Sequence, residues 1–198
     1  MKRVVPPNGA NLDPTELSMS ILRATLAGAA MLGATALSFA QDIAPENRMT
    51  IELKDGPVVI GLRPDLAPQH VERLKELAGE GFYDGVVFHR VIDGFMAQTG
   101  DPTGTGTGGS DKPDLPAEFT TEVSFERGTV GMARTSDPNS ANSQFFIMFD
   151  SAPHLNGDYT VVGEVIEGMD NVDAIKRGAG GGGMVDDPDK MIKVTVGS

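Results

Sequence analysis

The sequence predicts a mainly β fold in which short strands close into a barrel. Short apolar segments recur between residues 49 and 196, and turn pairs such as Asp-Gly separate them. Only two segments have the spacing of an amphipathic helix. Many short strands with few helices favour closure, because a closed barrel leaves no strand edge unpaired.

The composition is typical of a single globular domain. The chain has 198 residues, of which 39% are hydrophobic and 22% charged, so it can bury a core. Its formal net charge of −12 argues against nucleic acid as a partner. The absence of cysteine excludes disulfides and thiolate metal sites, and the three histidines are scattered along the chain. We therefore expect neither a metal nor a cofactor.

The N-terminal region is typical of an export signal. Residues 24–39 read ATLAGAAMLGATALSF, an apolar run that follows Arg23 and ends beside the small residues Ser38 and Ala40. We expect residues 19–40 to be a signal peptide, and residues 1–18 to be an unusually long leader or a wrongly assigned start, with Met19 favoured as the true start. The run is short for a membrane span, so a retained anchor is the alternative. Residues 41–48 are then a linker and residues 49–198 the domain of an exported protein, in the periplasm or secreted, with no stable membrane insertion.

The predicted elements follow in order. Residues 49–53 and 57–62 form a hairpin, because Asp55-Gly56 is a hairpin turn signal. Residues 68–78 carry apolar residues at helical spacing, begin with proline and are followed by glycine, which are start and stop signals of a helix. A second helix is predicted at residues 169–176, before a glycine run. Further strands are predicted at residues 86–91, 95–99, 117–119, 129–133, 144–148, 161–165 and 191–196.

Two glycine-rich segments are candidates for phosphate-binding loops. Residues 104–109 match G-x-G-x-x-G, but they run into SDKPDLP, where no helix can begin promptly. A phosphate site needs that helix N-terminus, so we expect a flexible surface loop that borders a cleft. Residues 178–183 are expected to be an unstructured connector with nothing bound.

Hydrolytic chemistry has little support in the sequence. The G-x-S-x-G pattern does not occur, and Ser140 and Ser143 lie in the polar stretch SDPNSANS. Asp84, Asp93 and Asp101 each lie beside glycine or proline, where aspartate is typical of turns. We therefore interpret these aspartates as scaffold residues rather than as catalytic groups.

Three sequence blocks carry a resemblance to a known family. Residues 88–101 read FHRVIDGFMAQTGD, residues 128–147 read GTVGMARTSDPNSANSQFFI, and residues 155–170 read LNGDYTVVGEVIEGMD. In this order they closely resemble the conserved blocks of the cyclophilins, a family of peptidyl-prolyl cis-trans isomerases, in its bacterial form. The resemblance covers about residues 49–196 and implies an eight-stranded antiparallel barrel closed by two helices. It agrees with the pattern of elements predicted above.

The resemblance also implies the site residues. Arg90 is then the catalytic cation, and Gln98 orients it and holds the peptide backbone, since a planar guanidinium offers fixed donors that lysine lacks. Apolar residues match the family's proline pocket: Phe95, Met96, Phe146 and Leu155. The remaining substrate-binding positions are Ala133, Arg134, Gln144, His154 and Tyr159. Strand periodicity adds that Met96 shares a face with Gln98, and that Gln144 and Phe146 share one, which leaves Phe145 toward the core.

Three positions depart from the best-known family members. His154 stands where they carry a tryptophan that contacts cyclosporin, so weak cyclosporin binding is expected. Arg134 and Thr135 replace smaller or neutral residues, which leaves the preference for the residue before proline open. His89 is expected to face away from Arg90 and to act as structural support.

Two functions are consistent with these residues. The first is an isomerase that acts on proline-containing polypeptides, as a monomer, and helps exported proteins to fold. The alternative is a peptide-binding chaperone with incidental catalysis. The complete set of pocket residues around Arg90 favours the enzyme, because a binding module would more often have lost the arginine.

Overall fold

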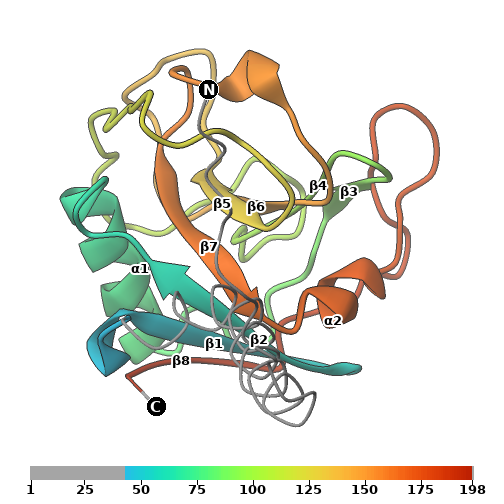
Figure 1. Ribbon diagram of the computed structural model, residues 1–198. Coiled ribbons are helices and arrows are strands. Elements are labelled where there is room, and N and C mark those ends of the chain that lie inside the picture. Colours follow the sequence, from blue (N-terminus) through green and yellow to red (C-terminus); the bar gives the residue numbers. More distant parts are fainter. Residues whose placement is uncertain (1–42, 198) are drawn as a thin grey trace, which may run out of the picture. The chain divides into compact units, whose positions relative to one another are not determined.

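The computed structural model describes residues 43–197, and the predicted leader and the first two residues of the linker, 41 and 42, lie outside them. Eight strands dominate this part of the chain (Figure 1). They are β1 (Arg48–Leu53), β2 (Gly56–Leu62), β3 (Arg90–Ile92), β4 (Met96–Thr99), β5 (Thr129–Met132), β6 (Phe145–Met148), β7 (Val161–Glu167) and β8 (Lys193–Val196). The α-helices are α1 (Pro68–Gly79) and α2 (Met169–Asp173), and the 3-10 helices are η1 (Pro45–Asn47) and η2 (Pro153–Leu155).

The strands form one antiparallel sheet in the order β3-β4-β6-β5-β7-β2-β1-β8. The sheet is curled but open, so the family expectation of a fully closed barrel is not confirmed. The edge strands β3 and β8 do not pair with each other within the described residues. Instead, residues 86–88, which precede β3, contact residues 189–191, which precede β8. The Phe88 amide donates to the carbonyl of Asp189, and the Met191 amide donates to the carbonyl of Val86. Pro188 and the turn at Asp187, which has a φ of 52°, keep the second of these segments irregular.

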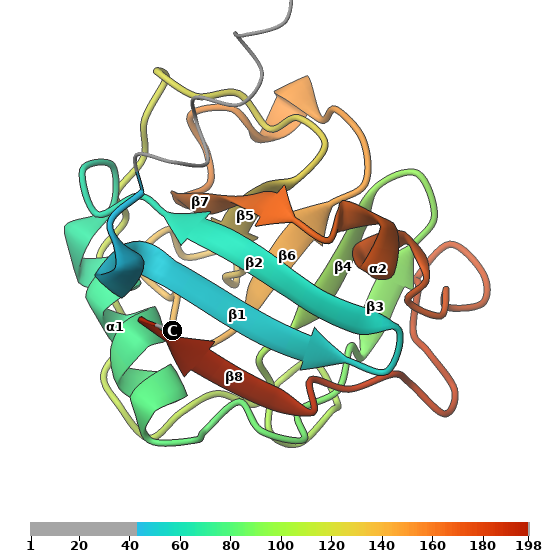
Figure 2. The same cartoon turned by 60° about the horizontal axis from the view of Figure 1, so that its bottom comes forward.

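The two helices lie toward opposite ends of the curled sheet (Figure 2). Helix α1 begins with Pro68 at its first turn and buries Val71, Leu74 and Leu77. These side chains join a core cluster that also contains residues of β1, β2, β5 and β6. The prediction for this helix is confirmed to within one residue.

Helix α2 is shorter than predicted. It ends at Asp173 rather than at Lys176. The backbone amide of Lys176 donates to the Asp189 carboxylate, and its Nζ donates to the carbonyls of Asp186 and Asp187. These contacts with residues 186–189, just beyond the glycine run, hold Lys176 outside the helix.

Two strand predictions are corrected. Residues 117–119 form no strand, because the amides of Ala117 and Glu118 donate to the side chains of Asn139 and Thr160 instead of to a neighbouring strand. Of residues 86–91 only the end belongs to β3, which begins at Arg90. The other predicted strands are found with ends that differ by up to two residues.

No helix among residues 43–197 is long and apolar enough to cross a membrane. Within the same residues, no three or more His, Asp or Glu side chains are grouped as a metal site would require.

Candidate active site

A pocket of about 290 Å³ brings together ten of the eleven predicted site residues. They are Arg90, Phe95, Met96, Gln98, Ala133, Arg134, Phe146, His154, Leu155 and Tyr159. The remaining residue, Gln144, lies in an adjoining groove together with residues 106–110. The expected site is therefore one continuous surface with two compartments, and Gln144 belongs to the second.

The alternation of side chains along β4 and β6 places this pocket on the outer face of the sheet. Ala97 and Phe145 belong to the main core cluster, whereas Met96 and Phe146 belong to a second apolar cluster beneath the pocket. This agrees with the predicted strand faces, since neighbouring residues on a strand point to opposite sides. The sheet thus separates the residues that stabilise the fold from those that form the pocket floor.

Aromatic packing shapes the apolar part of the pocket. The Phe146 ring stacks on Phe125 at 5.7 Å between centroids and meets the edge of Tyr159 at 5.9 Å. Phe95 stacks with His154 at 5.8 Å. Phe125 was not among the predicted site residues. It is 1% exposed and supports Phe146 from below, and no motif in its sequence surroundings marks that role.

Arg90 lies at the rim of this apolar pocket, and it is only partly buried. In the β3–β4 register it is paired with Gln98, and its Nη1 donates a hydrogen bond of 3.1 Å to Gln98 Oε1. Gln98 Nε2 in turn donates to Gln144 Oε1 at 2.8 Å. The guanidinium therefore keeps most of its donors available beside an apolar surface.

The chain of hydrogen bonds continues beyond Gln144. Its Nε2 donates to the carbonyls of Gly106 and Gly108, at 3.2 and 2.8 Å. The amides of the same two glycines donate to the Asp101 carboxylate, at 2.6 and 3.1 Å. Asp101 is thus connected to Arg90 through the loop, Gln144 and Gln98.

Asp101 organises the glycine-rich loop that was expected to be flexible. Its side chain is 0% exposed and also accepts hydrogen bonds from Thr103 and Thr105. Burial by itself would raise the pKa of this carboxyl, but the donors from Thr103, Gly108 and Gly106 lower the pKa to about 2. The loop does border the cleft, as predicted, and its order comes from a buried charge rather than from secondary structure.

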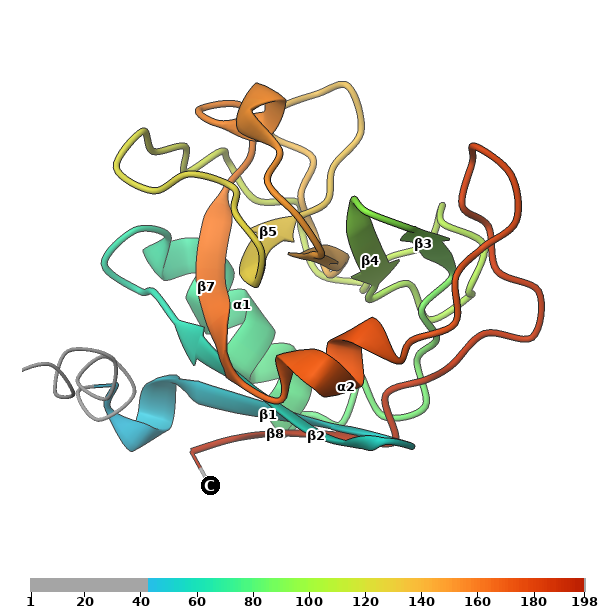
Figure 3. The same cartoon turned by 45° about the vertical axis from the view of Figure 1, so that its right-hand side comes forward.

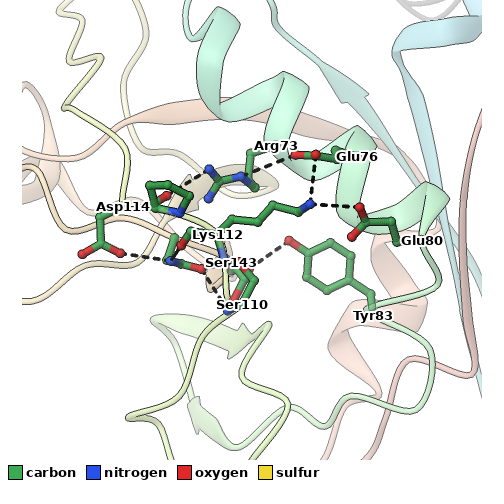
Figure 4. Close-up of polar contacts among 10 residues, drawn as sticks. Arg73, Glu76, Glu80, Tyr83, Ser110, Lys112, Asp114 and Ser143 are labelled. Atoms are coloured by element: carbon green, nitrogen blue, oxygen red, sulfur yellow. Dashed lines mark hydrogen bonds and ion pairs between the residues drawn. The ribbon is translucent and has the colours of Figure 1, made fainter.

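The end of the same loop is fixed to α1 by charged groups. Lys112 Nζ donates to Glu76 and Glu80 at 2.9 Å each, as Figure 4 shows. Nearby, the buried Tyr83 hydroxyl donates to the carbonyl of Ser143, the residue before Gln144. Burial raises the pKa of Tyr83, so this hydroxyl remains a donor at any physiological pH. The groove is therefore braced by contacts with α1 and with Tyr83.

Arg134 lines both compartments, as do Gln98 and Ala133. Its guanidinium lies 4.4 Å from the centroid of the Tyr159 ring and donates to the carbonyls of Asp158 and Thr135. Next to it, the Ala133 amide donates to the carbonyl of Gln144. Both predicted peptide-edge residues are therefore held in place by backbone contacts.

His89 faces the interior, as expected from its position next to Arg90. It is 1% exposed, and neither ring nitrogen has a hydrogen-bond partner within the described residues. Burial lowers the pKa of His89, which favours the neutral ring. A neutral, buried ring fits the predicted structural role.

The geometry suits the binding of a small apolar ring beside a planar cationic donor. Such a site can recognise a residue of a peptide and donate hydrogen bonds to its backbone without any covalent step.

Comparisons with known proteins give the same family that the three sequence blocks resemble. A sequence profile described as "Cyclophilin type peptidyl-prolyl cis-trans isomerase/CLD" matches residues 48–196. A "Probable peptidyl-prolyl cis-trans isomerase" of Brucella suis is 56% identical over 194 residues, which cover 90% of this chain and 97% of the relative. "Peptidyl-prolyl cis-trans isomerase-like 3" of Mus musculus is 39% identical over 132 residues, which cover 65% of this chain and 81% of the relative.

Solved structures share the fold. The cyclophilin-type isomerase of Cryptosporidium parvum, crystallised in the presence of the dipeptide Ala-Pro, matches with a TM-score of 0.71 and 30% identity, over 76% of this chain and 99% of its own. A cyclophilin of Hirschia baltica, AquaCyp293, matches with a TM-score of 0.69 and 28% identity, over 78% of this chain and 75% of its own. The profile match spans most of the chain and the bacterial relative is similar over nearly its whole length. This protein therefore belongs to the cyclophilin family of peptidyl-prolyl cis-trans isomerases.

Proposed function

We propose that this isomerase accelerates rotation about Xaa-Pro bonds in exported proteins, and that Arg90 stabilises the twisted amide. The observation that carries the proposal is the placement of the Arg90 guanidinium, hydrogen-bonded to Gln98, at the rim of a pocket lined by apolar side chains. This is the arrangement that non-covalent isomerisation requires.

The chemistry explains why a fixed cation is useful. Rotation about an amide bond has a barrier of about 18–20 kcal/mol, because the nitrogen lone pair is shared with the carbonyl. In the twisted state that sharing is lost, and the nitrogen becomes more pyramidal and more basic. A donor that approaches this nitrogen stabilises the twisted state more than the planar one, which lowers the barrier. Arg90 suits this role because a guanidinium presents several donors in one fixed plane.

The apolar residues provide the hold against which the bond turns. Met96 and Phe146 are 2% and 5% exposed and form the pocket floor, with Phe95 and Leu155 at its sides. A proline ring bound there is fixed, while the residue before it stays free to rotate. Ala133 and Arg134 lie where an extended peptide would run beside the pocket, and the Ala-Pro dipeptide present with the Cryptosporidium protein is a ligand of this class.

The test is two-dimensional exchange NMR on a short proline-containing peptide, with wild type, Arg90→Ala and Arg63→Ala compared. Arg63 is a control because its guanidinium pairs with Asp65 away from the pocket. We expect wild type and Arg63→Ala to speed cis-trans exchange equally, and Arg90→Ala to lose about 100-fold or more in kcat/KM. Failure of the wild type to speed exchange would disprove the activity for this chain, and a fully active Arg90→Ala would disprove the mechanism.

Export is proposed on the leader alone. The apolar run at residues 24–39 after Arg23, with Ser38 and Ala40 at its end, supports cleavage before Gln41. Fractionation of cells that express the whole chain, followed by N-terminal sequencing, tests this. A mature protein that starts at Gln41 in the periplasm is expected, and an uncleaved chain in the cytoplasm would refute it. The mature domain is proposed to be a monomer, which light scattering after gel filtration can check.

A further inference from the structure

The glycine-rich segment after α2 lies along the outer edge of β3. The amide of Val91 donates to the carbonyl of Gly183 at 2.7 Å, and the amide of Gly178 donates to the carbonyl of Val91 at 2.9 Å. In Figure 3 this segment, drawn in red, rises beside β3. Residues 178–183 are therefore not the unstructured connector that the sequence predicted. They provide the edge of β3 with hydrogen-bond partners that no strand supplies in the described sheet.

The same segment contacts the guanidinium of Arg90. Arg90 Nε donates a hydrogen bond of 3.1 Å to the carbonyl of Gly182, while its Nη1 donates to Gln98 Oε1. Two nitrogens of one planar group are thus bound from two segments of the chain. Because a guanidinium is rigid, two such bonds fix its plane, whereas one bond leaves it free to rotate.

We propose that residues 178–183, which we call the glycine clasp, form a positioning segment for catalysis. The Gly182 carbonyl orients Arg90 so that its remaining donors face the proline pocket. The clasp itself does not touch the peptide. This inference rests on the proposed role of Arg90 and adds a second support to the one that Gln98 provides.

The clasp depends on glycine at two positions and tolerates other residues at a third. Gly183 has a φ of +71°, and a Cβ there would overlap the Ile92 side chain and lie 3.1 Å from the Val91 carbonyl. A Cβ at Gly178 would overlap the Gly183 carbonyl. At Gly181 a Cβ would meet nothing within 4 Å, and φ is not positive. Alanine should therefore open the clasp at positions 178 and 183 and leave it closed at position 181.

The experiment compares Gly183→Ala and Gly178→Ala with the matched control Gly181→Ala in the peptide exchange assay. A lost hydrogen bond to a charged group predicts a kcat that is about tenfold lower for the first two variants. Their KM should stay near that of wild type, because the apolar pocket is unchanged. A general loss of structure would instead lower the amount of folded enzyme, which circular dichroism measures in the same samples. Equal kcat values for all three variants would overturn the proposal.

A spectroscopic signature of Arg90 keeps the test decisive if a variant folds poorly. In wild type, the Nε–Hε group of Arg90 should exchange with water more slowly than that of free arginine, and this protection should fall in Gly178→Ala but not in Gly181→Ala. An unprotected Nε–Hε in folded wild type would refute the clasp whatever the variants do. If Arg90→Ala is inactive but the clasp variants match their control, the mechanism stands and the clasp alone fails.

Discussion

Replacement of Asp101 by asparagine should destabilise the fold in a way that depends on pH. The carboxylate accepts hydrogen bonds from the amides of Thr103, Thr105, Gly106 and Gly108. Its pKa is about 2 in the folded chain, against an ordinary value of 3.8. That difference corresponds to about 2.5 kcal/mol of unfolding free energy. Asparagine keeps one acceptor oxygen and turns an NH₂ group toward these amides, so we expect a loss of about that size at pH 7.

The pH dependence follows from the direction of the change. A carboxylate with a lowered pKa stabilises the folded state fully at pH values above the pKa that the same group has in the unfolded chain, near 4. This contribution is lost as the pH falls through the folded-state pKa of about 2. The gap in unfolding free energy between wild type and Asp101→Asn should therefore be widest at neutral pH. It should narrow between about pH 4 and pH 2.

The assay is urea unfolding followed by circular dichroism at several pH values, with Asp111→Asn as the control. Asp111 is exposed and lies in the same loop, so its replacement should change stability by less than about 0.5 kcal/mol. A gap for Asp101→Asn that is equally small, or that stays constant from pH 7 to pH 2.5, would refute the account of Asp101 as a buried, charged anchor.

Three further predictions concern the pocket and its support. Gln144→Ala removes the link between Gln98 and the loop, so peptide exchange should show a kcat about fivefold lower. An unchanged kcat would contradict a role for the hydrogen bonds that connect Gln98 to the loop through Gln144. Phe146→Ala removes the pocket floor, so the Kd of a proline peptide, measured by NMR titration, should rise about tenfold, since about 1.5 kcal/mol of apolar contact is lost. Unaltered binding would show that proline sits elsewhere. His154→Trp adds an indole donor and apolar surface beside Phe95, so calorimetry should find cyclosporin bound about tenfold more tightly, and equal weak binding by both proteins would reject that explanation.

Local signals in the sequence predicted much of the fold. The Asp55-Gly56 turn identified the first hairpin, and the spacing of Val71, Leu74 and Leu77 identified α1, because both signals act within a few residues. The alternation along β4 and β6 separated core from pocket side chains, as the faces of Phe145 and Phe146 show. The composition of the pocket came from the family resemblance, since side chains from four separate segments meet there.

Contacts between distant segments account for what the sequence did not predict. Lys176 is held by a loop that ends α2 early, and the carbonyl of Gly182 reaches Arg90 across 92 positions of sequence. The role of Asp101 was hidden because most of its donors are backbone amides, which every residue type except proline supplies. The barrel does not close fully because β3 is only three residues long. Irregular segments, rather than paired strands, connect the two edges of the sheet.

The pairing of β1 with β8 has a consequence for how the chain acquires its structure. The first and last strands of the described sheet are neighbours, with Met49 opposite Val196. During synthesis β1 can pair with β2 at once, but its other partner, β8, is made only after all the other strands of the described sheet. Pairing between strands so far apart in the sequence slows folding, so the sheet stays incomplete until β8 has been made. A truncation within β8 should therefore abolish the fold of the whole sheet, although it removes none of the residues that line the pocket.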